Sequence, residues 1–263
     1  MGNSFDPVAG IYDDTFSNAL IGKAQRDIVW EYLRGKNIEN KNILEINCGT
    51  GVDAIFLSKN NTVTASDASE IMLKIIEEKI RQNALQRSCK TLLWDLNYPF
   101  PGDGVEKFDL VFSNFGGLNC LSPEALKNLS GELYNLLKPD GKMIFVVMGR
   151  KCIWESLYFI LKGKFKSAFR RRSKQVIKAQ LTENTFVDTY YYSPRELVLF
   201  FKQNFTLRKK LPVGFFIPPS YLEPFFKRKN RLLQFLSQLD RRVNNIGILS
   251  NYADHYLIEL EKS

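Results

Sequence analysis

Residues 43–53, ILEINCGTGVD, constrain the fold most, because an apolar strand runs into a glycine turn and then into a helix. Such a unit gathers backbone N–H groups and a helix N-terminus at one point, and Gly49 and Gly51 let a ligand come close. Asn47 stands where such turns usually have their first glycine. Asparagine tolerates the left-handed backbone region better than other non-glycine residues, so the turn can survive. The segment predicts a nucleotide-type site; the alternative is an ordinary strand–helix turn.

Short apolar segments alternate with helical patterns through the first half of the chain. This alternation predicts an α/β fold with a doubly wound, mostly parallel sheet. Ser69 and Ser122 are expected N-caps, and Pro139-Asp140-Gly141 is expected to be a turn. The expected strands are 42–46, 62–66, 89–94, 108–113 and 142–148, and the expected helices are 53–59, 69–84 and 123–137.

The second half of the chain breaks this rhythm. After an apolar, aromatic segment at 152–161, residues 174–181 and 185–192 alternate as a hairpin would, with its turn near Glu183-Asn184. Ser193 and Glu196 form a predicted capping box. Strands are expected at 206–216 and 253–260, and a partly helical insertion at 221–244.

Composition and length limit the class of protein. With 263 residues, 44% of them hydrophobic, one decorated domain is expected. No apolar run is long enough to cross a bilayer. The four cysteines, Cys48, Cys89, Cys120 and Cys152, are scattered, which argues against a metal site or a disulfide framework. These features predict a cytoplasmic protein without a bound metal.

The positive charge is concentrated in one segment. The formal net charge is +9, and residues 162–174, KGKFKSAFRRRSK, hold seven positive side chains. A solvated surface is the first interpretation of this run. Its interleaved Phe165 and Phe169 also suit peripheral contact with an anionic membrane, or with RNA.

Two carboxylates stand near the glycine turn. Asp67 ends the second expected strand, where a carboxylate can accept hydrogen bonds from both hydroxyls of a ribose. Glu45 lies inside the first strand, where dinucleotide-binding strands are usually apolar. A carboxylate at this position suits a ligand with a cationic end.

Beyond these residues, the sequence resembles the class I S-adenosylmethionine-dependent methyltransferases. The resemblance is carried by LEINCGTG (44–51), TASD (64–67), WDL (94–96), FDLVFSNFGGLN (108–119) and LKPDGKMIFV (137–146), together with FDPVAGIYDDTF (5–16). It implies a seven-stranded Rossmann-like sheet whose last strand is antiparallel, with insertions after strand 5 and between strands 6 and 7. It also implies S-adenosyl-L-methionine as the cofactor and methyl transfer as the activity.

The resemblance assigns roles to individual residues. At the methionine end of the cofactor it places Glu45, Asn47, Gly49 and Gly51. It places Asp67 at the ribose, and Ala68, Asp95 and Leu96 at the adenine. Asn114 and Phe115 would border the sulfonium and the acceptor, and Tyr12 would close the top of the site. Asn47 departs from the family's usual glycine, so its contact is the least defined of the set.

The resemblance also divides the chain. We expect one domain, 1–263. It would consist of an N-terminal helical cap (1–41), a cofactor-binding core (42–148), a lid insertion (149–192) and a C-terminal part (193–263). The C-terminal part would hold a helix, strands 6 and 7, and an insertion at 217–252. Both insertions are expected at the active-site edge, where their aromatic residues would exclude water: Trp154, Tyr158, Phe159, Phe165, Phe169, Tyr221, Phe225 and Phe226.

This lid suggests a small hydrophobic or aromatic metabolite, methylated on O, N or C. The fourth-strand tip reads SNFGG and not N/D-P-P-Y/F, the pattern of enzymes that methylate amino groups of bases and glutamine. This argues against a DNA or protein-glutamine target and makes a nucleic-acid partner unlikely, although the basic run still suits RNA. His255, the only histidine, is expected at the start of the last strand. It is a candidate general base; the alternative is a partly buried residue bonded to backbone.

Two other functions are compatible with the glycine turn. A nicotinamide-dependent oxidoreductase would need a full G-x-G-x-x-G, which Glu45, Asn47 and Ala54 do not match. A binding protein of the same fold would contact RNA or a membrane without turnover. The sequence does not predict an oligomeric state.

Overall fold

The computed structural model describes residues 4–102, 106–182 and 185–263. Its main feature is a seven-stranded sheet in the order β3-β2-β1-β4-β5-β9-β8. The first five strands are parallel, and β9 runs antiparallel to both of its neighbours. The expected fold class is therefore confirmed. The strands are β1 (Asn42–Ile46), β2 (Thr62–Asp67), β3 (Cys89–Leu93), β4 (Phe108–Ser113), β5 (Leu137–Met148), β8 (Phe205–Val213) and β9 (His255–Lys262).

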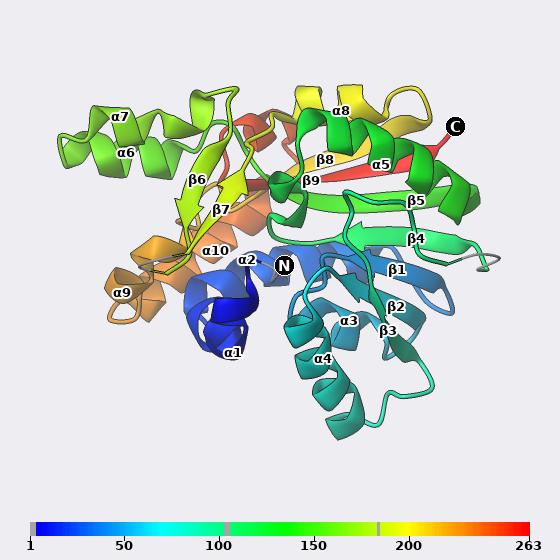
Figure 1. Ribbon diagram of the computed structural model, residues 1–263. Helices are drawn as coiled ribbons and strands as arrows, with labels where there is room; N and C mark the ends of the chain where they lie inside the picture. Colours follow the sequence, from blue (N-terminus) through cyan, green and yellow to red (C-terminus); the bar gives the residue numbers. More distant parts are fainter. Residues whose placement is uncertain (1–3, 103–105, 183–184) are drawn as a thin grey trace.

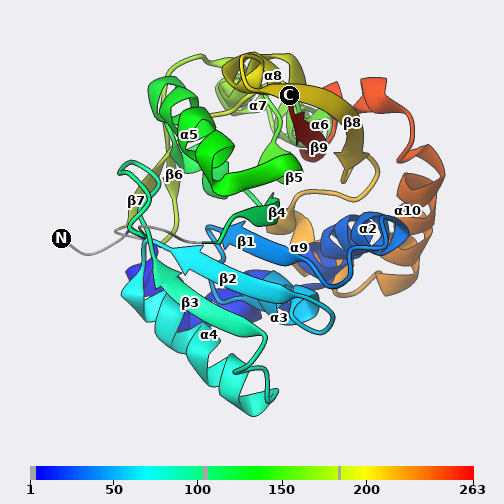
Figure 2. The ribbon, with the colours of Figure 1, turned by 90° about the vertical axis from the view of Figure 1, so that its right-hand side faces the viewer.

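Helices cover both faces of the sheet (Figures 1 and 2). One face carries α2 (Leu20–Gly35), α3 (Val52–Leu57), α4 (Glu70–Gln82) and α10 (Asn230–Val243); the other carries α5 (Pro123–Leu136) and α8 (Pro194–Phe201). Successive side chains of a strand point to opposite faces, so Ile43 packs in the first core and Leu44 in the second. The remaining short helices are α1 (Ala9–Tyr12), α6 (Ile153–Leu161), α7 (Phe165–Ala168) and α9 (Glu223–Phe226).

The predicted helix caps are present. Ser69 accepts a hydrogen bond from the N–H of Met72, Ser122 caps α5, and Ser193 and Glu196 form a reciprocal capping box. The predicted turn at 139–141 is wrong, because these residues lie within β5. The pairing jumps from Phe108↔Leu137 to Leu110↔Lys142, so the turn-forming residues make an irregularity inside the strand.

The insertion after β5 forms two separate structures. Helices α6 and α7 lie side by side and extend away from the sheet, whereas β6 (Ile177–Gln180) and β7 (Phe186–Thr189) form an antiparallel hairpin (Figure 1). The hairpin lies at the end of the sheet where the parallel strands finish. Its predicted turn at Glu183-Asn184 lies outside the described residues. Asn119 ties the hairpin to the core by donating to the carbonyl of Tyr190 at 2.6 Å.

Within the described ranges, no helix combines the length and the apolar character that crossing a bilayer requires.

Candidate active site

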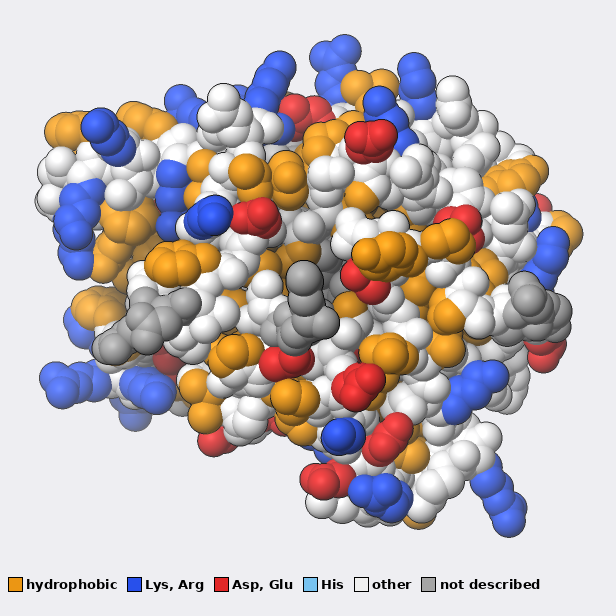
Figure 3. All heavy atoms as spheres, viewed as in Figure 1, with side chains coloured by type: hydrophobic (Ala, Val, Ile, Leu, Met, Phe, Trp, Pro, Cys, Tyr) orange, Lys and Arg blue, Asp and Glu red, His pale blue; other side chains and the backbone are white. Residues whose placement is uncertain are grey.

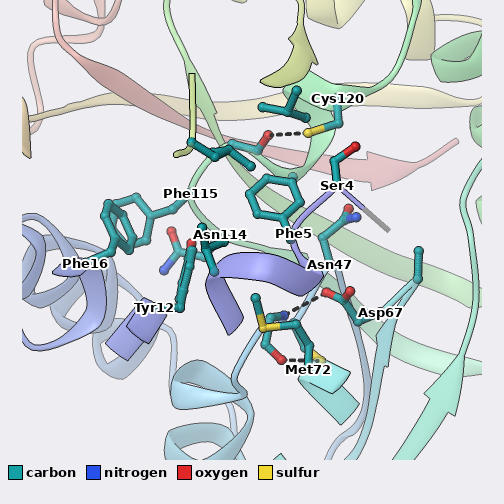
Figure 4. A pocket seen from close by; sticks show the side chains of 18 of the residues that line it. Ser4, Phe5, Tyr12, Phe16, Asn47, Asp67, Met72, Asn114, Phe115 and Cys120 are labelled. Atoms are coloured by element: carbon teal, nitrogen blue, oxygen red, sulfur yellow. Dashed lines mark hydrogen bonds between the residues drawn. The ribbon is translucent and has the colours of Figure 1, made fainter. Parts of the chain in front are cut away.

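A cavity of about 900 Å³ opens at the carboxyl ends of β1, β2 and β4. Its wall also includes the segment before α2 and both strands of the hairpin. Of the eleven predicted cofactor-binding residues, ten line it: Tyr12, Glu45, Asn47, Gly49, Asp67, Ala68, Asp95, Leu96, Asn114 and Phe115. Figure 4 shows the rings of Tyr12, Phe16 and Phe115 on one side and the Asp67 carboxylate on the other. The topology therefore brings segments far apart in sequence to one cavity.

The glycine turn adopts the strained backbone that its sequence predicts. Asn47 has φ +54°, so asparagine does occupy the left-handed region. Gly49 has φ +52°, and a Cβ built on it would meet nothing within 4 Å, because that position faces the cavity. Asp67 accepts hydrogen bonds from the N–H groups of Gly49 and Ser69, each at 2.9 Å. The turn and the carboxylate are thus held together as one rigid unit.

Gly51 packs against a neighbouring helix, and its predicted contact with the cofactor stays a prediction. It does not line the cavity; a Cβ at this position would lie 2.1 Å from the Ile76 side chain. Gly51 therefore allows α3 and α4 to pack closely. Gly117, which sequence reasoning missed, makes room for Asn47, since a Cβ there would lie 2.4 Å from the Asn47 Cβ. Gly117 and Asn47 are in contact in the fold, and their separation along the chain does not predict this contact.

Several buried polar atoms at the cavity have no partner among the described residues. They are Glu45 Oε2, Asn47 Oδ1 and Asn114 Oδ1. Burial, followed by the nearby Asp53, raises the pKa of Glu45 well above its ordinary value. Buried polar atoms normally have partners, so these three point to a ligand that supplies hydrogen-bond donors. An aminoacyl group with an ammonium end fits this wall.

Arg26 is a site residue that sequence reasoning missed. It is buried in α2, lines the cavity, and its Nε lies 3.3 Å from Asp53 Oδ2. Asn114 donates to the same carboxylate at 3.1 Å, and the guanidinium carbon lies 5.2 Å from the centre of the Phe115 ring. Arg26 belongs to the buried stripe of α2, with Gly22, Val29 and Leu33 at helical spacing. The sequence could have indicated Arg26, because it is a charged residue at a position that helical spacing places on the apolar face of α2.

The segment before α2 is tied over the glycine turn by Asp13. Its carboxylate accepts a hydrogen bond from the Thr50 hydroxyl at 2.6 Å and one from the Lys79 ammonium. Burial alone would raise the pKa of Asp13, but these bonds outweigh it and lower the pKa. Asp13 is therefore ionised at neutral pH and holds Tyr12 beside the cavity.

Replacing Asp13 with alanine should weaken binding of S-adenosylhomocysteine roughly three- to tenfold, because one or two partly exposed hydrogen bonds are lost. Calorimetric titration measures the change. Asp14→Ala is the matched control, since Asp14 is exposed and does not line the cavity. Equal affinities of the two variants would contradict a role for this contact in closing the site.

His255 begins β9, as predicted, but it does not line the cavity. Its ring packs edge-on against Phe115 with centroids 5.3 Å apart, and its Nδ1 lies 3.2 Å from Asp254 Oδ2. Phe115 therefore stands between His255 and the cavity. The catalytic role of His255 stays a prediction.

The prediction that eight aromatic side chains of the two insertions screen the active site is wrong for these side chains. None of the eight predicted aromatic side chains lines the cavity, because α6 and α7 extend away from it. The hairpin covers it instead, through residues 178, 179, 181 and 186–189. Tyr158 and Phe159 pack on Tyr221, with ring centroids 5.4 and 6.0 Å apart, and so join the two insertions.

The basic run is not uniformly solvated. Arg171 is buried and binds Glu155 at 2.9 Å and Asp254 at 2.8 Å. Arg170 donates to the same glutamate at 2.8 Å. These ion pairs join the lid insertion to the start of β9. The expectation of a solvated surface is therefore wrong for Arg171.

The four cysteines are free thiols. Cys120 lines the cavity, and burial raises the pKa of its thiol to about 12, so it remains protonated at neutral pH. In the part of the chain that the structure describes, no cluster of three or more His, Cys, Asp or Glu side chains could hold a metal ion.

A doubly wound sheet with a glycine turn and an acid at the tip of β2 is typical of nucleoside-binding α/β proteins. Residues 43–141 match the family described as a methyltransferase domain. This segment, which holds the glycine turn and Asp67, is therefore similar to methyltransferase domains.

Relatives and a solved structure agree with this assignment. A demethylmenaquinone methyltransferase of Lactobacillus johnsonii is 33% identical over 133 residues, which cover 46% of this chain and 52% of that protein. A tRNA N(3)-methylcytidine methyltransferase of Schizosaccharomyces pombe is 25% identical over 182 residues, 64% of this chain and 52% of that one. The chain thus spans about half the length of these relatives. The CcbJ methyltransferase of Streptomyces caelestis shares the fold, with a TM-score of 0.64, 13% identity, and coverage of 100% and 98%.

Proposed function

We propose that this protein transfers a methyl group from S-adenosylmethionine to a small, largely apolar metabolite. The observation that carries the proposal is the single cavity in which Glu45, Asn47, Gly49 and Asp67 meet, within the segment that matches the methyltransferase family. When bound, S-adenosylmethionine supplies an electrophilic methyl group on a sulfonium.

The residues of the cavity divide the work of binding and alignment. Glu45 accepts hydrogen bonds from the ammonium end, and Asp67 accepts those of the ribose hydroxyls. Asp95 and Leu96 hold the base. The faces of Tyr12 and Phe115 favour a cation beside them. Methyl transfer depends mainly on the alignment of donor and acceptor. Asn114 and Phe115, at the tip of β4, would therefore contribute by holding the two groups in line.

The hairpin and the β4–α5 connection form the acceptor side of the cavity. Its apolar wall consists of Leu121, Met148, Leu181, Phe186 and Val187. Lys178 and Asp188 are register partners across the hairpin, and both also line the cavity. This combination favours an apolar body that carries a polar group. Burial raises the pKa of Tyr12 to about 12, so Tyr12 can donate a hydrogen bond to the acceptor but does not act as a base near neutral pH.

Titration calorimetry with S-adenosylmethionine and S-adenosylhomocysteine tests the donor site directly. Micromolar or tighter binding of either is expected, because the cavity preorganises the turn and the carboxylate. Absence of heat and of thermal stabilisation with both compounds would end the proposal. NAD⁺ and NADH serve as controls: stabilisation by these alone would favour the oxidoreductase alternative.

Transfer of labelled methyl groups tests the acceptor. Label in quinol-type or phenolic compounds of apolar character would support the proposal. Label in RNA alone would replace it with the nucleic-acid function, for which the likeness to a tRNA methyltransferase gives a reason.

A further inference from the structure

Helix α6 exposes its apolar face and buries its charged residue. Ile153, Leu157 and Leu161 recur every four residues, and their exposed fractions are 40%, 53% and 87%. On the opposite side, Glu155 is buried in ion pairs with Arg170 and Arg171. A surface helix of a globular protein normally has the reverse arrangement. The outward apolar face of α6 therefore lacks a partner within the described chain.

The neighbouring helix continues this apolar face. Phe165 on α7 is 62% exposed, and Phe169 directly after α7 is 39% exposed. The Ser156 hydroxyl donates to the carbonyl of Ala168 at 2.9 Å, which fixes the two helices together. We call Ile153, Leu157, Leu161, Phe165 and Phe169 the α6–α7 surface. It lies at the same end of the molecule as the hairpin over the cavity (Figure 1).

Positive charge surrounds this surface. The sequence holds no Asp or Glu from 156 to 182, whereas the same stretch has eight basic residues: Lys162, Lys164, Lys166, Arg170, Arg171, Arg172, Lys174 and Lys178. Within the described ranges, Lys164, Lys166, Arg172 and Lys174 form no ion pair. Figure 3 shows hydrophobic and Lys or Arg side chains next to one another at this end of the protein.

A second basic segment lies nearby. Tyr158 of α6 packs on Tyr221, which precedes α9, with ring centroids 5.4 Å apart. After α9, Lys227, Arg228, Lys229 and Arg231 are all exposed, and Phe225 on α9 is exposed beside them. Both insertions therefore present basic and apolar side chains at one end of the molecule.

We propose that the α6–α7 surface docks on an anionic phospholipid bilayer. Exposed leucine, isoleucine and phenylalanine side chains would enter the boundary between headgroups and acyl chains, while the surrounding lysines and arginines would meet lipid phosphates. Helix α6 has nine residues, so it would lie in the interface and not span the bilayer. This docking is independent of methyl transfer, because the surface does not share a residue with the cavity wall.

The aliphatic residues separate a bilayer from other anionic or apolar partners. Single-stranded RNA binds through stacking on aromatic rings and through backbone phosphates, and it offers no place for Leu157 and Leu161. A second copy of this chain would bring two strongly positive surfaces together, which is electrostatically unfavourable.

Vesicle sedimentation of the 263-residue chain tests the proposal without any methyl donor. We expect retention on vesicles of phosphatidylcholine with phosphatidylglycerol, weak retention on pure phosphatidylcholine, and loss of binding at high salt. Leu161→Ser with Phe165→Ser should lower the partition coefficient roughly tenfold, since both side chains are exposed and their apolar area is lost. Lys164→Glu with Lys166→Glu should lower it by roughly tenfold or more.

Matched variants control for general effects on folding and net charge. Leu199→Ser removes an exposed leucine from α8, and Lys59→Glu with Lys127→Glu makes the same charge change away from the surface. These variants should bind vesicles like the parent. Four outcomes would each overturn the proposal: no retention on anionic vesicles, equal losses in test and control variants, retention by RNA alone, or self-association that the Leu161→Ser/Phe165→Ser change abolishes in place of vesicle binding.

Discussion

Replacing Gly49 with valine is expected to weaken S-adenosylhomocysteine binding by roughly a hundredfold or more, about 3 kcal/mol. A side chain at Gly49 would project into the cavity, where a built Cβ meets no protein atom within 4 Å. The protein should still fold, because the space is empty of protein and the positive φ costs only about 1–2 kcal/mol. Calorimetric titration gives the affinity, and thermal unfolding gives the stability.

The control variant Gly163→Val distinguishes obstruction of the cavity by a side chain from the cost of a positive φ. Gly163 also has a positive φ, +69°, and open space at its Cβ, but it does not line the cavity. Both variants should lose similar stability, and only Gly49→Val should lose binding. Equal affinities of Gly49→Val and Gly163→Val would refute the placement of the donor across this turn.

Replacing Arg171 with methionine is expected to lower the free energy of unfolding by about 3–5 kcal/mol. The side chains of Arg171, Glu155 and Asp254 are 7%, 2% and 4% exposed, so the variant would leave two carboxylates buried with fewer partners. Arg172→Met is the matched control in the same run. Arg172 is exposed, and its guanidinium packs on the Phe169 ring; its hydrogen bonds to Arg150 and Phe169 are made by its backbone, which the substitution keeps. Its loss should therefore change stability by less than about 1 kcal/mol. Urea denaturation measures both, and similar losses would contradict a structural role for Arg171.

The same network gives stability a dependence on pH. Burial alone would raise the pKa of Asp254, but His255 and Arg171 outweigh it and hold the pKa well below its ordinary value. A carboxyl whose pKa is lowered on folding stabilises the protein above its unfolded pKa, roughly 4, and this contribution is lost as the pH falls further. Arg171→Met should therefore lose less stability than the parent between about pH 4 and pH 2.

Local patterns were sufficient to predict the sheet and the glycine turn. Period-two and helical spacing, the caps at Ser69, Ser122 and Ser193, and the tolerance of asparagine for positive φ all act over a few residues. The end of β2 places Asp67 beside the turn in any doubly wound sheet. The remaining site residues were implied by the resemblance to the methyltransferases, and ten of the eleven predicted residues reach one cavity.

Contacts between distant segments decided the rest. Arg26 and Gly117 belong to the cavity region only because α2 and the tip of β4 pack against the turn. Aromatic content indicated the wrong side chains for the cover, because composition does not give the direction in which a segment leaves the sheet. The hairpin that lines the cavity does lie within the predicted lid insertion, 149–192.

The sequence by itself determined the class of fold and the backbone of the glycine turn, since both follow from short-range periodicity and backbone preference. Only the tertiary structure decided that the hairpin covers the cavity, that Arg171 is buried while Arg172 is exposed, and that α6 presents its leucines to solvent. These features depend on contacts with residues that are distant along the chain, such as the Asp254 carboxylate that pairs with Arg171. Local sequence patterns do not contain that information.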